Sequence, residues 1–98
     1  MIVELRLYNT VTGRTREFVD AYKAEGLPIQ QPVQGNLLGF YVHEFGPMEQ
    51  VMMLWGYADL ADRERRRSEL DAMPAWRDFL RKVAPMVRAH ESRLLVPA

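Results

Sequence analysis

Hydrophobic and polar residues alternate along the first segment of the chain, over residues 2–9. Side chains on a β-strand point to opposite faces in turn, so this period of two predicts a strand. One face carries Val3, Leu5 and Leu7, which we expect to pack under the chain's own helices. The opposite face carries Ile2, Glu4, Arg6 and Tyr8, and we expect it to point away from the helices.

The next stretch predicts a helix followed by an irregular connection. Apolar residues recur at helical spacing over residues 14–25. Gly26 is expected to end this helix, because glycine takes a positive φ without a Cβ clash. Pro28 and Pro32 then predict an irregular connection over residues 27–35.

Two further strands are predicted on either side of a break at Gly46-Pro47. Residues 37–45 are rich in aromatic and β-branched side chains, and residues 50–57 form a nearly continuous apolar run. One face of the second strand carries Val51, Met53, Trp55 and Tyr57, and the other carries Met52 and Leu54. A strand that is apolar on both faces is normally covered on both sides.

The C-terminal part predicts two helices and a last strand. Asp59 is a suitable N-cap for a helix that runs to about residue 72, and Pro74 suits the first position of a second helix. An apolar stripe at helical spacing follows, made of Trp76, Phe79, Leu80 and Val83. Pro85 ends this helix, and residues 88–96 predict the last strand.

The order of these elements is β-α-β-β-α-β, which predicts a single ferredoxin-like α+β domain over residues 1–98. A right-handed crossover between the first two strands leaves a gap that the third strand fills. The sheet is therefore expected to be antiparallel, with the strand order 4-1-3-2. Helices then cover only one face of the sheet. Because residues 50–57 are apolar on both faces, we expect a second copy of the chain to cover the other face in a homodimer.

The composition excludes several classes of function. The 13 basic residues equal the 13 acidic residues, whereas a nucleic-acid-binding surface needs an excess of positive charge. The absence of cysteine excludes thiol catalysis, disulfides and thiolate metal sites. No apolar run approaches the roughly 20 residues that span a bilayer, and charges interrupt the first apolar stretch, unlike a signal peptide. We therefore expect a cytoplasmic protein that associates with neither nucleic acid nor membrane.

Three segments near the middle of the chain form a specific combination: Gly39–Pro47, Leu54–Leu60 and the arginine-rich run Arg63–Arg67. This combination resembles the central signature of the NIPSNAP family. The remaining matches to the family are weaker and cover Val3–Tyr8, Gly26–Gln30, Pro74–Trp76 and Glu91–Pro97. The resemblance implies a dimeric α/β-barrel built from two ferredoxin-like chains. It implies little chemistry, because the biochemistry of the family is largely undefined.

Two departures from the family's pattern concern candidate chemistry. Many relatives have asparagine at the position of Glu49 and histidine at the position of Met53. If that imidazole takes part in chemistry in the relatives, this chain lacks it.

Two arginines are candidates for binding an anion. Arg63 and Arg67 are four residues apart, at the edge of the helix face that Leu60 and Leu70 turn toward the sheet. Planar guanidinium groups in this arrangement would clamp a carboxylate or an enolate. In the alternative interpretation, their stems cover apolar surface while their charges meet water or acidic neighbours.

A polar face and two aromatic residues complete the candidate binding site. Arg6 and Tyr8 share a strand face with Glu4 and would form the polar floor of a cavity. The alternative is an ion pair across to the last strand. Trp55 and Tyr57 are candidates for an apolar wall, and Tyr41 and Trp76 are further aromatic residues that could supply one. Aromatic residues in a small domain nevertheless belong more often to its core.

His43 and His90 are the only histidines, and each is a candidate general base near neutral pH. Each would equally fit a hydrogen-bonded residue of the core or the rim. Two histidines without an evident third ligand predict no metal site. No phosphate-binding loop, Ser-His-Asp order or cofactor motif is present, so no cofactor is expected.

These observations favour a small homodimer that binds a small anionic or aromatic molecule between the sheet and the helices. A cofactor-independent monooxygenase or isomerase is an alternative that rests on analogy of fold. A protein-interaction module without a small-molecule site is another, with the charged helix at residues 59–72 as its partner surface.

Overall fold

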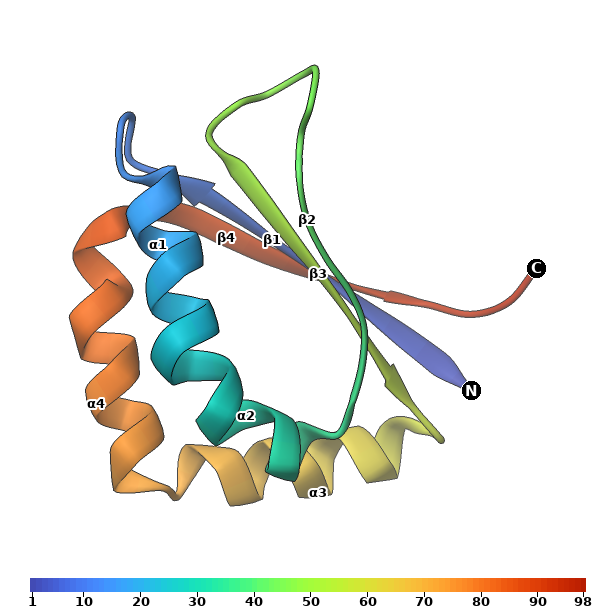
Figure 1. Ribbon diagram of the computed structural model, residues 1–98. Helices are drawn as coiled ribbons and strands as arrows, with labels where there is room; N and C mark the ends of the chain where they lie inside the picture. The colour runs from blue at the N-terminus through green and yellow to red at the C-terminus, as the bar shows by residue number, and fades with distance from the viewer.

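Four strands form one antiparallel sheet on which four α-helices pack (Figure 1). This computed structural model describes all 98 residues. The strands are β1 (Ile2–Thr10), β2 (Asn36–Val42), β3 (Gln50–Tyr57) and β4 (Val87–Leu95). The α-helices are α1 (Thr15–Ala21), α2 (Leu27–Gln34), α3 (Leu60–Asp71) and α4 (Pro74–Val83). A π-helical turn (Tyr22–Gly26) joins α1 to α2, and a 3-10 turn (Ala84–Met86) follows α4.

The spatial order of the strands is β2-β3-β1-β4, which is the predicted order 4-1-3-2 read from the opposite edge. All neighbouring strands are antiparallel, so the ferredoxin-like α+β prediction is confirmed. The predicted helix starts also hold, because Asp59 caps α3 by accepting a 2.8 Å hydrogen bond from the N–H of Asp62, and Pro74 opens α4. None of the helices has the length and hydropathy needed to cross a lipid bilayer.

The face of β1 that we expected to point away from the helices is the face they cover. Tyr8 packs against Phe18 of α1, with 5.3 Å between the ring centroids. Glu4, on the same face, is fully buried. The prediction was wrong because pairing with the most buried strand, β3, decides which face of β1 is inside. The charges of Glu4 and Arg6 compensate each other there, at 3.1 Å.

The opposite face of the sheet carries the remaining apolar residues of the two central strands. Leu5 lies opposite Leu54, and Leu7 lies opposite Met52. Figure 1 shows every helix on the other side of the sheet, so no helix of the chain packs on these residues. Leu5, Met52 and Leu54 are partly exposed there, while neighbouring side chains leave Leu7 only 8% exposed. We call these four residues the open apolar face, because no helix covers them.

The first helical segment continues past Gly26, and the prediction of an irregular connection over residues 27–35 was wrong. Gly26 has a helical φ of −67°. Pro28 lies in the first turn of α2, where proline's missing N–H is tolerated. The helix ends instead at Gly35, whose φ is 95°. Gly26 serves close packing, since a Cβ there would lie 2.6 Å from the ring of Phe79.

Replacing Gly26 by alanine is expected to destabilise the protein by about 1–3 kcal/mol, as overpacking of a filled core usually does. The new Cβ would lie within 2.7 Å of two ring atoms of Phe79 and 3.0 Å from Tyr22. Chemical denaturation would measure the loss. The second substitution Phe79→Leu should recover part of it in the double variant, and simple additivity of the two costs would contradict this explanation.

Strand β2 is shorter than the sequence predicted. It ends at Val42, whereas we expected the strand to reach Phe45. Phe45 is 89% exposed and belongs to the loop that leads to β3. The strand was predicted to reach Phe45 because aromatic residues are typical of strands. No other part of the chain packs on Phe45, so the strand ends earlier.

Candidate functional site

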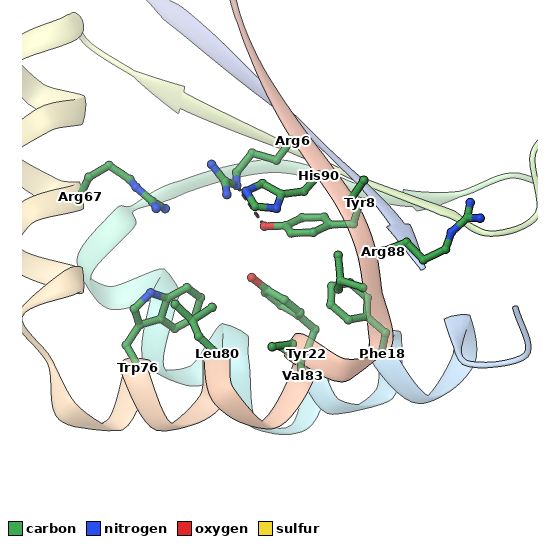
Figure 2. Close-up of a pocket in the computed structure, with 13 residues that line it drawn as sticks. Arg6, Tyr8, Phe18, Tyr22, Arg67, Trp76, Leu80, Val83, Arg88 and His90 are labelled. Carbon is green, nitrogen blue, oxygen red and sulfur yellow. Dashed lines mark hydrogen bonds between the residues drawn. The ribbon is translucent and has the colours of Figure 1, made fainter. Parts of the chain in front are cut away.

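A cavity of about 400 Å³ lies between the edge of the sheet and the helices. One side of the cavity comes from β1 and β4, and the opposite side comes from α1, the π-helical turn and α4, while α3 contributes Arg67 (Figure 2). The apolar part of its lining includes Phe18, Trp76, Leu80 and Val83. No carboxylate lines this cavity, whereas Arg6, Arg67 and Arg88 all do. Figure 2 shows the guanidinium of Arg67 turned toward the cavity and that of Arg88 turned away from it.

The fold brings together polar groups from distant parts of the chain. Tyr8 on β1 lies directly opposite His90 on β4, and both side chains line the cavity with Tyr22. Figure 2 shows the hydroxyls of Tyr8 and Tyr22 and the guanidinium of Arg67 pointing toward the same space. Burial raises the pKa of Tyr22 well above its usual value, so its hydroxyl stays neutral and is able to donate a hydrogen bond.

Glu4 lies under the sheet-side end of this site and is fully buried. Its Oε2 accepts hydrogen bonds from Arg6 at 3.1 Å, from Arg63 at 3.0 Å and from the Ser92 hydroxyl. Burial alone would raise the pKa of Glu4. The hydrogen bonds from Arg63 and Ser92 and the charges of the two arginines outweigh burial and lower this pKa to about 2. Glu4 is therefore ionised at neutral pH.

A chain of buried hydrogen bonds links Glu4 to α2. The Tyr57 hydroxyl donates to Oε1 of Glu4 at 3.3 Å, and Nε2 of Gln34 donates to the Tyr57 oxygen at 2.7 Å. Gln30, one turn earlier on α2, donates to Gln34 at 2.9 Å. Burial, followed by the charge of Glu4, raises the pKa of Tyr57 to about 12. The polar side chains of α2 therefore belong to the core, where sequence patterns did not place them.

Arg6 connects this buried network to the cavity. Its Nε donates to the Tyr8 hydroxyl at 3.0 Å, while its Nη1 binds Glu4. Burial alone would lower the pKa of Arg6, but interactions with Tyr8 and then with Glu4 outweigh burial and raise this pKa. Because Arg6 uses two of its donors in this way, its orientation is fixed before any ligand binds.

Arg67 is a half-buried cation without a close counter-charge. Its side chain is 21% exposed, and the nearest carboxylate, that of Asp71, is 4.0 Å away. Its Nη1 donates to the neutral Oε1 of Gln34 at 3.3 Å. A partly desolvated charge with such weak compensation gains much from an anionic ligand.

The structure separates the two arginines that the sequence suggested as a clamp. Arg63 points to Glu4 and also pairs with Glu64, so its charge is already compensated, and the hydrogen bond with Glu4 raises its pKa. Arg67 lines the cavity, but Arg63 does not. The second arginine that lines the cavity beside Arg67 is Arg6. Arg6 comes from strand β1, whereas the predicted second arginine, Arg63, comes from the same helix as Arg67.

The other predicted site residues fall into two groups. Trp55 and Tyr57 are buried in the core and do not line the cavity, while His90 does. His43 lies outside it and hydrogen-bonds Gln50 through Nε2 at 2.9 Å. Of the two candidate bases, only His90 is therefore next to a possible ligand.

Sequence reasoning named Trp76 among the aromatic wall residues, and Trp76 lines the cavity, but it missed Phe18 and Tyr22. Tyr22 and Phe18 came from a helix that looked like ordinary core, with ring centroids 5.2 Å apart. Trp76 belongs to the apolar stripe of α4, and its Nε1–H is buried without a hydrogen-bond partner. An indole and a phenol on core-facing stripes were the available signal, because each brings a polar atom inside.

Comparison with known proteins places this fold in one family. The NIPSNAP family model matches residues 3–98. A NIPSNAP-like domain protein from Burkholderia xenovorans is 43% identical, with a TM-score of 0.95, over 99% of this chain and 84% of that one. A NIPSNAP family protein from Agrobacterium tumefaciens is 38% identical, also with a TM-score of 0.95, over 99% of this chain and 92% of that one.

Curated relatives are more distant and longer. "Protein NipSnap homolog" from Dictyostelium discoideum is 29% identical in an alignment of 97 residues that covers 96% of this chain and 41% of the relative. The chain thus spans about two fifths of that relative's length. A putative antibiotic biosynthesis monooxygenase from Nitrosomonas europaea has a TM-score of 0.71 at 11% identity, over 99% of this chain and 98% of that one, which shows likeness of fold alone.

The structure is that of a small ferredoxin-like α+β protein with a basic, aromatic-walled cavity between sheet and helices. The chain belongs to the NIPSNAP family, as the central segments and the arginine-rich run indicated.

Proposed function

We propose that this chain binds a small anionic or aromatic molecule in the cavity between the sheet and the helices. The observation that carries the proposal is Arg67, whose half-buried guanidinium lines the cavity without a carboxylate closer than 4.0 Å. The apolar walls support it, since ligand pockets combine mostly apolar lining with a few convergent polar groups. A cavity of about 400 Å³ is at the lower end of the usual range for such pockets.

Replacing Arg67 by alanine is expected to weaken binding of an aromatic anion about tenfold, because a charge-assisted hydrogen bond is lost. Anilinonaphthalene sulfonate is a suitable fluorescent probe, since it is an aromatic monoanion. Arg65→Ala is the matched control, because Arg65 lies on the same helix with its side chain 68% exposed. Equal probe affinity in the wild type and both variants would show that Arg67 does not bind the anion, and it would refute this proposal.

We also propose that two copies of the chain pair through the open apolar face. Support comes from Leu5, Leu7, Met52 and Leu54, which face away from all helices. Burial of the partly exposed Leu5, Met52 and Leu54 against a second copy would remove apolar surface from water. This face lies on the opposite side of the sheet from the cavity, so pairing leaves the ligand site intact.

The remaining expectations stay predictions. The likeness to a monooxygenase is one of fold, and fold does not determine chemistry, so we propose no reaction. The interaction module remains an alternative for a protein whose cavity binds nothing. Cytoplasmic location remains a prediction that cell fractionation would test.

A further inference from the structure

The charges around the cavity leave room for a single negative charge. Oε2 of Glu4 is shared between Arg6 and Arg63, and Arg63 has a second carboxylate in Glu64. Arg88 has no ion-pair partner, but Figure 2 shows its side chain pointing away from the cavity. Of the guanidinium groups that point into the cavity, only Arg67 has no carboxylate closer than 4.0 Å. One uncompensated guanidinium is neutralised by a monoanion, whereas a dianion such as a phosphate monoester would bring an excess of negative charge into a mostly apolar site.

The polar groups of the cavity that still have a hydrogen atom to give to a ligand are hydrogen-bond donors. Arg67 offers N–H groups, and the neutral Tyr22 offers its hydroxyl. Trp76 offers an indole N–H that is buried and has no partner in the protein. The Tyr8 oxygen already accepts from Arg6, so the proton of Tyr8 is available as well. A carboxylate has only acceptor sites and fits this set, because its two oxygens take several N–H and O–H donors at once.

The space beside these donors is bounded by aromatic rings. The ring centroids of Tyr22 and Trp76 are 6.3 Å apart in an edge-on arrangement, and those of Phe18 and Tyr22 are 5.2 Å apart. An aromatic ligand would gain roughly 0.5–1.5 kcal/mol per offset or edge-to-face ring contact, beyond the free energy of burying its apolar area. The limited volume suits one ring with a short acidic side chain.

We infer that the ligand of this cavity is a monocarboxylic acid with one aromatic ring, its carboxylate held by Arg67 beside Arg6 and its ring enclosed by Tyr22, Phe18 and Trp76. The inference rests on the proposed binding function and narrows it to one chemical class. It assigns Glu4 and Gln34 as positioning residues, since they orient Arg6 and Arg67 by hydrogen bonds.

A matched set of three probes tests each part of this assignment. Phenylacetate carries both features, phenylacetamide keeps the ring without the charge, and cyclohexylacetate keeps the charge without the aromatic ring. Calorimetric titration of the wild-type protein should give the tightest binding for phenylacetate. The amide should bind at least about tenfold more weakly, and cyclohexylacetate several-fold more weakly.

Substitution of Arg67 distinguishes recognition of the ligand's charge from non-specific apolar binding. In Arg67→Gln, phenylacetate and phenylacetamide should bind with nearly equal affinity, whereas Arg65→Gln should keep the wild-type preference for the acid. If Arg67→Gln fails to fold, Arg67→Lys retains the charge without the planar fork and should give a reduced preference. Equal binding of acid and amide by the wild type would overturn the inference, as would a preference for the acid that survives in Arg67→Gln.

The outcomes also distinguish this inference from the proposed function. Binding of anilinonaphthalene sulfonate through Arg67 without binding of phenylacetate would overturn the aromatic-acid assignment and leave the binding function standing. Binding of neither probe would overturn both.

Discussion

Replacing Glu4 by glutamine is expected to lower the free energy of unfolding at neutral pH by about 3 kcal/mol. The native pKa of Glu4 is about 2 against an ordinary 4.5, and each unit corresponds to about 1.4 kcal/mol. Glutamine resembles the protonated acid, so it loses this contribution. It also leaves Arg6 and Arg63 without the carboxylate that they share, which is costly for buried cations.

The pH dependence of this effect has a defined sign. Glu4 has a depressed pKa in the folded state, so its contribution is complete above about pH 4.5 and is lost as the pH falls toward 2. As the pH falls over this range, the free energy of unfolding should therefore decrease more for the wild type than for Glu4→Gln. The gap between them should shrink to about half by roughly pH 3. Urea denaturation at one fixed protein concentration, followed through the buried Trp55 and Trp76, measures both values.

An exposed carboxylate provides the control for this experiment. Glu17 also has a lowered pKa, because of its hydrogen bond with Arg14, but that pair is open to solvent. Exposed pairs contribute little to stability, so Glu17→Gln should behave almost like the wild type. A gap for Glu4→Gln that stays constant between neutral and acidic pH would show that Glu4 is not the titrating group.

Replacing Leu54 by lysine is expected to convert the proposed dimer into a monomer. Leu54 lies opposite Leu5 at the centre of the open apolar face. A twofold interface would place the substitution in both copies, and each lysine would have to be buried without a partner. We expect the dissociation constant to rise at least about 100-fold, which corresponds to roughly 3 kcal/mol.

Sedimentation velocity at micromolar concentration distinguishes the two states, because the chain has a mass of 11.4 kDa and a dimer twice that mass. Leu60→Lys is the control, since Leu60 is exposed on α3, on the helical side of the sheet. A wild-type protein that sediments as a monomer would refute the dimer directly. Retention of the dimer by Leu54→Lys would refute the assigned face.

Most of the elements were predictable because their signals are local. The strand at residues 50–57, the cap at Asp59 and the helix start at Pro74 agree with the structure. The helix beyond Gly26 was missed because two prolines and a glycine are typical of loops. Pro28 lies in the first turn of α2, where proline is tolerated, but Pro32 lies inside this helix, against the usual preference. The sequence also did not show that Phe79 would pack against Gly26.

The candidate site was predictable in its residue types and less so in its partners. Arg6, Tyr8 and Arg67 line the cavity, but Arg63 binds Glu4. A helical spacing of four placed Arg63 and Arg67 on one side of α3. It did not reveal which carboxylate would lie within reach of each guanidinium, because those carboxylates come from elsewhere in the chain.

The amino-acid pattern was sufficient for the order of strands and helices, and thereby for the ferredoxin-like sheet, because periodicity and caps act over a few residues. Only the tertiary structure decided which face of β1 is buried. A one-residue difference in pairing reverses the faces of a strand, and the apolar and polar faces of β1 both had plausible partners. That choice placed Glu4, Arg6 and Tyr8 beneath the helices, and Arg67 from a distant helix completed the cavity.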